Sequence, residues 1–199
     1  MIRSAPAGTI LSVSFDRTML GIKPIALAMV LLSVLADAMA APGDVPTVGA
    51  GDLGPARDLA PVERAGSPLG HEAFVFQSGL SHIAAIEQSG IAHQATTRQE
   101  GVGNSVRIAQ WGQANEAIVT QNGQGNDAVL SQMGMANSGR ISQAGTSNNA
   151  SVSSTGDRNR ALIEQTGNGN LADVQQFGIG LNVVVQQQGN NARTRIVQR

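Results

Sequence analysis

Three histidines are the side chains with the clearest potential for metal or proton chemistry. His71, His82 and His93 are the only histidines of the chain and lie eleven residues apart. Because imidazole binds metal ions and titrates near neutral pH, one interpretation is a metal site or a pH sensor. No Asp or Glu lies at a ligand spacing from them, and two aligned histidines are a weak ligand set. We favour the alternative that they replace another polar residue of a repeat.

No other group of residues points to catalysis. Glu72 and Glu87 could act as an acid–base pair only in a cleft, and a thin repeat structure offers none. The serines lack a nearby histidine and fit strand and turn positions. Cysteine is absent, which excludes thiol catalysis and disulfides. We therefore expect no catalytic, cofactor-binding or metal-binding residues and no cofactor, and an enzyme is the least favoured class.

Glutamine and asparagine offer a different chemistry, hydrogen bonding between side-chain amides. Glutamine recurs at every eleventh position, interrupted once by Ser154: Gln77, Gln88, Gln99, Gln110, Gln121, Gln132, Gln143, Gln165, Gln176, Gln187 and Gln198. Glycine follows two residues later: Gly79, Gly90, Gly101, Gly112, Gly123, Gly134, Gly145, Gly156, Gly167, Gly178 and Gly189. Asparagine follows three residues after that in seven units: Asn104, Asn115, Asn126, Asn137, Asn148, Asn159 and Asn170. A fixed period of this kind indicates a repeat architecture.

Each unit predicts a seven-residue strand followed by a four-residue turn. From His82 to Gln88, every second residue has nearly the same type in all units, whereas the residues between them vary. This alternation is typical of a strand with one buried face. Side chains alternate between the two faces of a strand, so in one continuous strand a repeat of eleven residues would turn the buried face outward in every second unit. We therefore expect residues 89–92, which include the glycine, to form a turn that keeps the same face buried in each unit. Two units then form a closed coil of 22 residues. A right-handed coiled coil is the helical alternative, but the repeated glycines and the missing apolar stripe disfavour it.

Stacked 22-residue coils would place identical residues above one another. Glutamines, asparagines, alanines and aliphatic residues would each form columns, with the amides hydrogen bonding along their column. The sequence therefore predicts an all-β fold, a parallel β-solenoid with cross-β character and about six rungs, over residues 71–199. The absence of proline after Pro68 agrees with continuous β-structure.

Residues 1–40 predict a secretory signal peptide. Lys23 precedes the apolar run 25–35, and residues 38–40 form an Ala-Met-Ala cleavage signal. The region before Lys23 is long, so translation could start at Met19. Residues 41–70 are rich in Pro and Gly and predict a flexible leader. The charge of −1 provides no basic surface for nucleic acid, and no small-molecule substrate is expected.

The unit Gln121-x-Gly123-x-x-Asn126-x-Ala128-x-x-x-Gln132 resembles the curlin repeat of curli fibre subunits. The ending of residues 193–199, with Arg193, Arg195 and Arg199, resembles the minor, nucleating subunit more than the major one. The resemblance implies a secreted subunit that nucleates functional amyloid at the cell surface for adhesion and biofilm. It also implies three kinds of partner: the chain itself, the major curlin subunit, and the outer-membrane secretion and anchoring machinery. The leader of residues 41–70 is longer than the export segment usual in this family.

Several interpretations stay open. The three arginines fit either a charged cap that limits growth or a docking tip that anchors the fibre. The chain could also be the major subunit or a monomeric solenoid adhesin, although the outward positions show none of the regularity expected of a binding face. Trp111, Met133 and Phe177 share one turn column and predict an exposed patch for lateral contact.

Overall fold

The computed structural model describes residues 10–15, 29–35 and 70–199, and every element in these ranges is a β-strand. The strands are β1 (Ile10–Phe15), β2 (Met29–Leu35), β3 (Glu72–Leu80), β4 (Ile83–Ile91), β5 (Gln94–Val102), β6 (Ser105–Gln113), β7 (Glu116–Gln124), β8 (Asp127–Met135), β9 (Ser138–Thr146), β10 (Asn149–Asp157), β11 (Arg160–Asn168), β12 (Leu171–Ile179), β13 (Asn182–Asn190) and β14 (Arg193–Gln198). No helix that could span a membrane occurs among the described residues.

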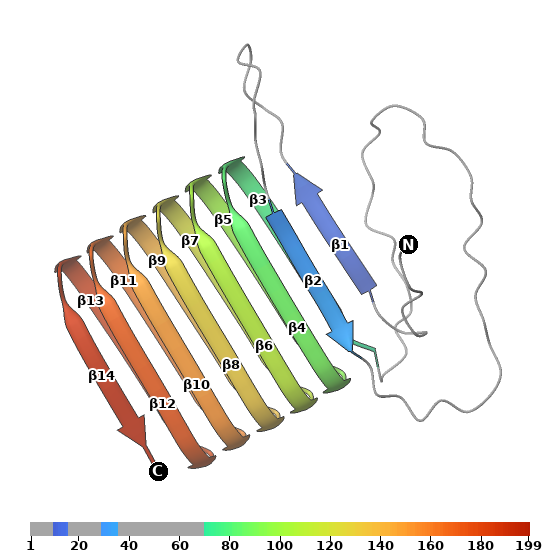
Figure 1. Cartoon of the computed structure of the whole chain (residues 1–199). Coiled ribbons are helices and arrows are strands. Elements are labelled where there is room, and N and C mark those ends of the chain that lie inside the picture. The colour runs from blue at the N-terminus through green and yellow to red at the C-terminus, as the bar shows by residue number, and fades with distance from the viewer. Residues whose placement is uncertain (1–9, 16–28, 36–69) are drawn as a thin grey trace, which may run out of the picture.

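The strands alternate between two parallel sheets. The odd-numbered strands pair in the order β1-β3-β5-β7-β9-β11-β13, and the even-numbered strands pair in the order β2-β4-β6-β8-β10-β12-β14. Each strand pairs with the strand one coil later, so that Gln99 lies beside Gln121 and Gln121 beside Gln143. Figure 1 shows the resulting flattened solenoid, with the coils stacked in chain order. The predicted all-β parallel β-solenoid of 22-residue coils is confirmed.

Alternating side chains fill a thin core between the two sheets. In β7, for example, Ala117, Val119 and Gln121 are buried, whereas the residues between them reach the surface. Each sheet therefore carries two apolar columns, one mostly of alanine or valine and one mostly of larger aliphatic residues. Burying a Val, Leu or Ile side chain contributes about 1.5–3 kcal/mol, so these columns supply most of the apolar stabilisation. Gly139 stands in the alanine column where a Cβ atom would lie 2.8 Å from Leu130 Cδ1, so the larger leucine takes its space.

The connections are shorter than the four residues expected from the sequence. The complete strands β3 to β13 are nine residues long, and two residues join each strand to the next. The repeated glycine lies inside the strand, one residue before its end. There its φ is positive, as at Gly123 with φ 121°, and a Cβ atom on Gly123 would lie only 2.0 Å from the oxygen of Gly145 in the next coil. Close stacking of coils, together with positive φ, therefore requires glycine here.

The chain reverses at the first connecting residue, which adopts the left-handed conformation. This residue is glycine in some turns, but Ala92, Ala114 and Ala136 also occupy it with φ between 53° and 55°. The reversal therefore does not depend on glycine, and the residue that reverses the chain is not the one that the sequence suggested.

The two N-terminal strands extend the sheets at the front of the solenoid. β1 pairs with β3 and β2 pairs with β4, both in parallel. Both strands lie within the predicted signal peptide of residues 1–40, and β2 lies within its apolar run. The other residues of that peptide, and residues 41–69 of the predicted leader, lie outside the described residues. Cleavage after residue 40, which stays a prediction, would remove both strands and leave β3 and β4 as the front edges.

Candidate functional site

The glutamines form two hydrogen-bonded ladders inside the solenoid. In the odd sheet each side-chain Nε2 donates to Oε1 of the glutamine one coil later, from Gln77 through to Gln187, at 2.7–2.9 Å. The second N–H of Nε2 donates to a backbone carbonyl in the opposite sheet, as from Gln121 to Ser105 at 2.9 Å. Each interior glutamine thereby links two coils and both sheets, and its amide is satisfied although it is fully buried.

The ladders have a direction. Every donor points toward the C-terminal end of the solenoid and every acceptor toward the N-terminal end. At the front, Oε1 of Gln77 and Oε1 of Gln88 are buried and accept no hydrogen bond from a described residue. At the back, Gln187 and Gln198 end the two columns, and their Nε2 atoms contact only groups of their own final coils. Unmatched acceptors therefore lie at one end and the last donors at the other.

Ser154 interrupts the ladder of the even sheet. Its hydroxyl donates to Gln176 Oε1 at 3.0 Å, but it is too short to meet Gln132, whose Nε2 donates to a backbone carbonyl only. The Ser154 side chain is buried, as are the glutamines on either side of it.

The substitution Ser154→Gln is expected to complete this ladder. The new amide can accept from Gln132 and donate to Gln176, so we expect the free energy of unfolding to rise by about 1 kcal/mol, the usual net contribution of one hydrogen bond. Denaturant titration measures the change. Ser153→Gln, which places the same side chain outward on the same strand, serves as the control and should leave stability unchanged. A loss of stability with Ser154→Gln would mean that the sheet of even-numbered strands cannot hold a glutamine in every coil.

Asparagine columns support the turns in a similar way. Asn104 Oδ1 accepts from the backbone N–H of Asn126 in the next coil at 3.0 Å. Its Nδ2 donates to the carbonyl of Glu100 at 2.9 Å and to that of Gly123 at 3.2 Å. Each asparagine thus satisfies carbonyl and N–H groups that the reversal of the chain leaves without strand partners. At the C-terminal end, Leu181 and Ala192 take this position and end the two columns.

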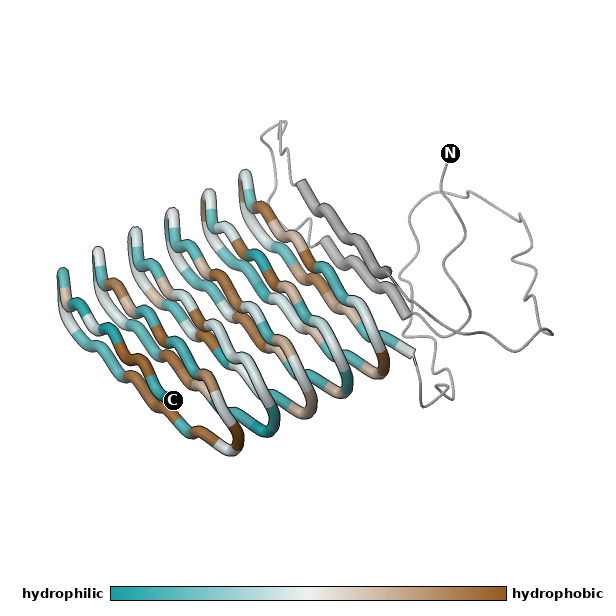
Figure 2. Tube along the Cα trace, turned by 60° about the horizontal axis from the view of Figure 1, so that its bottom comes forward, coloured by the Kyte–Doolittle hydropathy of each residue, from teal (hydrophilic) through white to brown (hydrophobic). Residues whose placement is uncertain are grey.

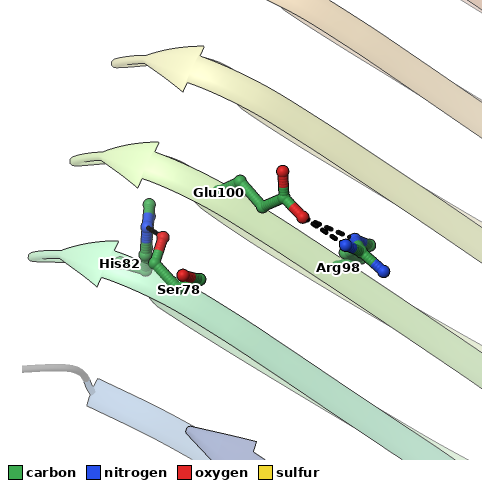
Figure 3. A network of polar contacts seen from close by, with 4 residues as sticks. All are labelled: Ser78, His82, Arg98 and Glu100. Atoms are coloured by element: carbon green, nitrogen blue, oxygen red, sulfur yellow. Dashed lines mark hydrogen bonds and ion pairs between the residues drawn. The ribbon is translucent and has the colours of Figure 1, made fainter. Parts of the chain in front are cut away.

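The three histidines occupy the asparagine position. His82 and His93 make equivalent contacts through both ring nitrogens, whereas His71 makes only the contact through Nδ1, which accepts from the backbone N–H of His93 at 3.2 Å. Nδ1 of His82 accepts from the backbone N–H of Asn104 at 3.3 Å, and its Nε2 lies 3.0 Å from the carbonyl oxygen of Ser78. Figure 3 shows this contact beside the surface ion pair of Arg98 and Glu100. His93 repeats both contacts. An imidazole with the proton on Nε2 therefore replaces the asparagine amide, as the repeat interpretation predicted.

His71 and His93 also stack on each other. Their ring centroids lie 5.0 Å apart with an interplanar angle of 8°. Burial lowers the pKa of both, and the charge of His93 lowers that of His71 further, against a smaller opposing effect of backbone hydrogen bonds. Among the described residues no group of three or more potential metal ligands comes together.

The first coils are expected to lose stability in acid. The folded pKa of His71 and of His93 lies below the ordinary value near 6.5, so below that pH the unfolded chain binds protons that the fold excludes. Protonation would also place a hydrogen on Nδ1, where each ring accepts a backbone N–H. Hydrogen exchange of β3 and β4 should therefore be faster at pH 5 than at pH 7.5, after correction for the intrinsic rate. The double variant His71→Asn/His93→Asn serves as control, and an equal acid sensitivity in it would contradict the role of the histidines.

The arginines of the last strand lie at the C-terminal end and are exposed. Arg195 Nε lies 3.4 Å from Asp173 Oδ2 on the neighbouring strand, and both side chains are partly solvated. Arg193 and Arg199 are also exposed. An exposed pair of this kind contributes at most about 1 kcal/mol, so the positive charge of this end remains available to a partner.

Two shallow hollows of the described surface lie on turns. One, of about 370 Å³, is lined by residues of the turns after β6, β8 and β10, and the other, of about 540 Å³, lies on the opposite turn edge. Neither gathers an acid–base pair or a nucleophile with its base.

Sequence reasoning missed two features of this site. The direction of the ladders depends on how each amide is oriented, which residue types do not reveal. The hydrogen bond from each glutamine side chain to a backbone carbonyl of the opposite sheet depends on how far the two sheets are shifted along the solenoid axis. The signal that was available is the alignment of glutamines at a spacing of 22, which identifies the columns but not their polarity.

Comparison with known families agrees with the repeat. Residues 101–134, 134–167 and 155–178 match the family of the curlin associated repeat. The match supports a curlin-type protein. The matched segments contain all seven repeat asparagines, whereas the three histidines and the last coil lie outside them. No curated protein and no solved structure matches the chain. Curlin repeats on a β-solenoid suggest a curli fibre subunit and point to a non-enzymatic protein.

Proposed function

We propose that the chain is a secreted subunit of a curli-type extracellular fibre that grows by stacking solenoids end to end. The observation that carries this proposal is the match between the two ends. Gln77 Oε1 and Gln88 Oε1 are buried acceptors without described donors at the front. Gln187 and Gln198 carry the last donors of the same two columns at the back. Docking of a back end on a front end would continue both ladders if Gln187 exchanges its hydrogen bond to Thr194 Oγ1 for one to Gln77 Oε1 of the next copy. The strand edges would pair at the same time.

Release of the front end is part of the proposal. In the described structure β1 and β2 occupy the front edges, with Phe15 paired to Gln77 and Val34 to Gln88. Cleavage after residue 40 during export would therefore free an edge that another copy, or the major curlin subunit, can complete. The leader of residues 41–70 would serve recognition by the outer-membrane secretion machinery.

The nucleating, minor subunit is the more specific assignment that we propose. Two features support it: the exposed Arg193, Arg195 and Arg199, and the replacement of asparagine by Leu181 and Ala192. A C-terminal end that differs from the other coils suits a tip that anchors to the cell surface, while the opposite end templates growth. The function would then be nucleation of fibres for adhesion and biofilm. The major subunit is the alternative, in which the same arginines would be a cap that slows growth.

Polymerisation kinetics test the stacking proposal. Residues 41–199 at micromolar concentration should give a sigmoidal rise in thioflavin fluorescence, and the full chain a longer lag because its front is covered. Gln88→Leu should slow growth on preformed seeds, because it removes an acceptor at the docking end. Gln124→Leu, on the surface, should grow at the normal rate. Equal seeded growth of the two variants would contradict end-to-end continuation of the ladder.

A comparison of two C-terminal variants tests the nucleating assignment. Deletion of residues 192–199 removes β14, whereas the triple variant Arg193→Gln/Arg195→Gln/Arg199→Gln keeps the strand and removes only the charge. If the tip anchors through charge, both variants should lose surface attachment while the remaining coils keep their β-sheet signal. Normal attachment and seeding by both variants would rule out the tip and favour the major subunit.

A further inference from the structure

The two turn edges of the solenoid carry different side chains. We name the turns after the even-numbered strands the even edge and those after the odd-numbered strands the odd edge. The last strand residues along the even edge are Ile91, Gln113, Met135, Asp157 and Ile179. Those along the odd edge are Leu80, Val102, Gln124, Thr146, Asn168 and Asn190. After its first two turns the odd edge is wholly polar at this position, whereas the even edge is apolar at both ends and in the middle.

The apolar side chains of the even edge are exposed. Met133, Met135, Phe177 and Ile179 keep between 42% and 64% of their surface accessible, and Ile91 is also exposed. Figure 2 shows apolar colour at the two ends of this edge, on the side where the even strands end in Figure 1. Aligned exposed apolar residues of this kind mark a contact surface rather than a solvated edge.

The centre of the even edge has a shape that can receive side chains. The shallow hollow of about 370 Å³ is lined there by Ala114, Ala136, Met135, Gln113, Asp157 and Arg158. The short alanines occupy the reversal position, so they leave space between the longer side chains of adjacent coils. A methionine is unbranched and flexible, which suits it to fill such an irregular space.

The order of residues along this edge is complementary to itself when reversed. A two-fold axis through Met135, perpendicular to the solenoid axis, would place Met135 against Met135 and Ile91 against Ile179 of the second copy. It would also place Gln113 against Asp157. Asp157 Oδ1 accepts from the backbone N–H of Met135 at 3.0 Å, which leaves Oδ2 for the glutamine amide. Such an isologous contact repeats each pairing on both sides of the axis.

A parallel pairing would be less favourable. Two copies side by side in the same direction would bring Asp157 against Asp157 and Arg158 against Arg158 at the same level. Like charges directly opposite are destabilising, whereas the reversed arrangement brings Arg158 against Ala114. We infer that the even edge is a lateral interface for a second copy of this chain running in the opposite direction. This inference needs only the folded solenoid, so it is independent of growth at the ends.

Disulfide trapping tests the interface directly, because the chain has no cysteine. In the full chain, Met135→Cys lies on the proposed axis and should form a disulfide-linked dimer under mild oxidation. Thr146→Cys lies on the odd edge at the corresponding strand end, is also exposed, and serves as the matched control. We expect at least about tenfold more dimer from Met135→Cys. A yield no higher than that of the control would overturn the interface.

Two further variants test the direction of pairing. Ile91→Cys alone and Ile179→Cys alone should form little dimer, whereas their equimolar mixture should form a mixed dimer. The antiparallel arrangement would be overturned if each single variant formed dimers efficiently and the mixture formed no more mixed dimer than either variant forms alone. Growth at the ends cannot produce the Met135→Cys dimer. Successive copies place residue 135 six coils, or about 29 Å, apart, and a disulfide requires Cα atoms within about 7 Å.

Discussion

The substitution Gly123→Ala is expected to disrupt the solenoid at the coil that contains it. The added Cβ atom would lie 2.0 Å from the oxygen of Gly145, and the φ of 121° is strained for any residue other than glycine. Backbone of the next coil, not a flexible side chain, blocks the site, so the two coils would have to separate. We expect the free energy of unfolding to fall by at least about 4 kcal/mol, which is exceptional for a single methyl group. Denaturant titration followed by circular dichroism measures it.

Gly125→Ala is the matched control for this prediction. Gly125 has a φ of 61°, and a Cβ atom added to it would have Ser147 Oγ, at 3.8 Å, as its nearest heavy atom. Ala92, Ala114 and Ala136 already occupy the equivalent position. We expect a loss of only about 1 kcal/mol from the left-handed conformation. Equal losses for the two variants would mean that stacking between coils is not what requires glycine at position 123.

The substitution Gln121→Leu is expected to have the second largest effect. Gln121 accepts from Gln99 at 2.9 Å and donates to Gln143 at 2.8 Å, and its second donor reaches the opposite sheet. Leucine fills a similar volume but leaves buried groups on both neighbours without their ladder partner. Each unsatisfied buried group costs about 1–3 kcal/mol, so we expect a total loss of about 3 kcal/mol.

Gln124→Leu separates the ladder from the general effect of losing a glutamine. Gln124 ends the same strand, β7, and its side chain is exposed. We expect a change within about 0.5 kcal/mol, as for most surface substitutions. Comparable destabilisation by Gln121→Leu and Gln124→Leu in denaturant titration would contradict the structural role of the buried ladder.

Much of the fold could be predicted because the repeat constrains it. The alternation of fixed and variable residues around Ile86 and Gln88 indicated a strand with one buried face, and the odd period required a reversal. Since two reversals close a coil, the spacing of 22 residues followed. This reasoning could not identify why the glycine is fixed. Sequence cannot distinguish a turn glycine from one where adjacent backbones approach closely, and at Gly123 the second reason applies.

The candidate site was predictable in part for similar physical reasons. The glutamine columns follow from the period, and the interpretation of His82 and His93 as substitutes for asparagine follows from their position in the unit. The unmatched acceptors at Gln77 and Gln88 could not be predicted. They depend on the orientation of every amide along the column. Of the even edge, the sequence predicted only an apolar column through Trp111, Met133 and Phe177. Its complementarity to a second copy could be recognised only once the register between coils was known.

Fibre diffraction from aligned assemblies of residues 41–199 tests the central claim most directly. If solenoids stack end to end, the coil spacing continues without interruption along the fibre. A sharp meridional reflection at about 4.7–4.8 Å and an equatorial reflection at about 10 Å should then appear. A protein that stays monomeric for days at micromolar concentration would contradict the account, as would assemblies whose 4.7–4.8 Å reflection does not lie along the fibre axis.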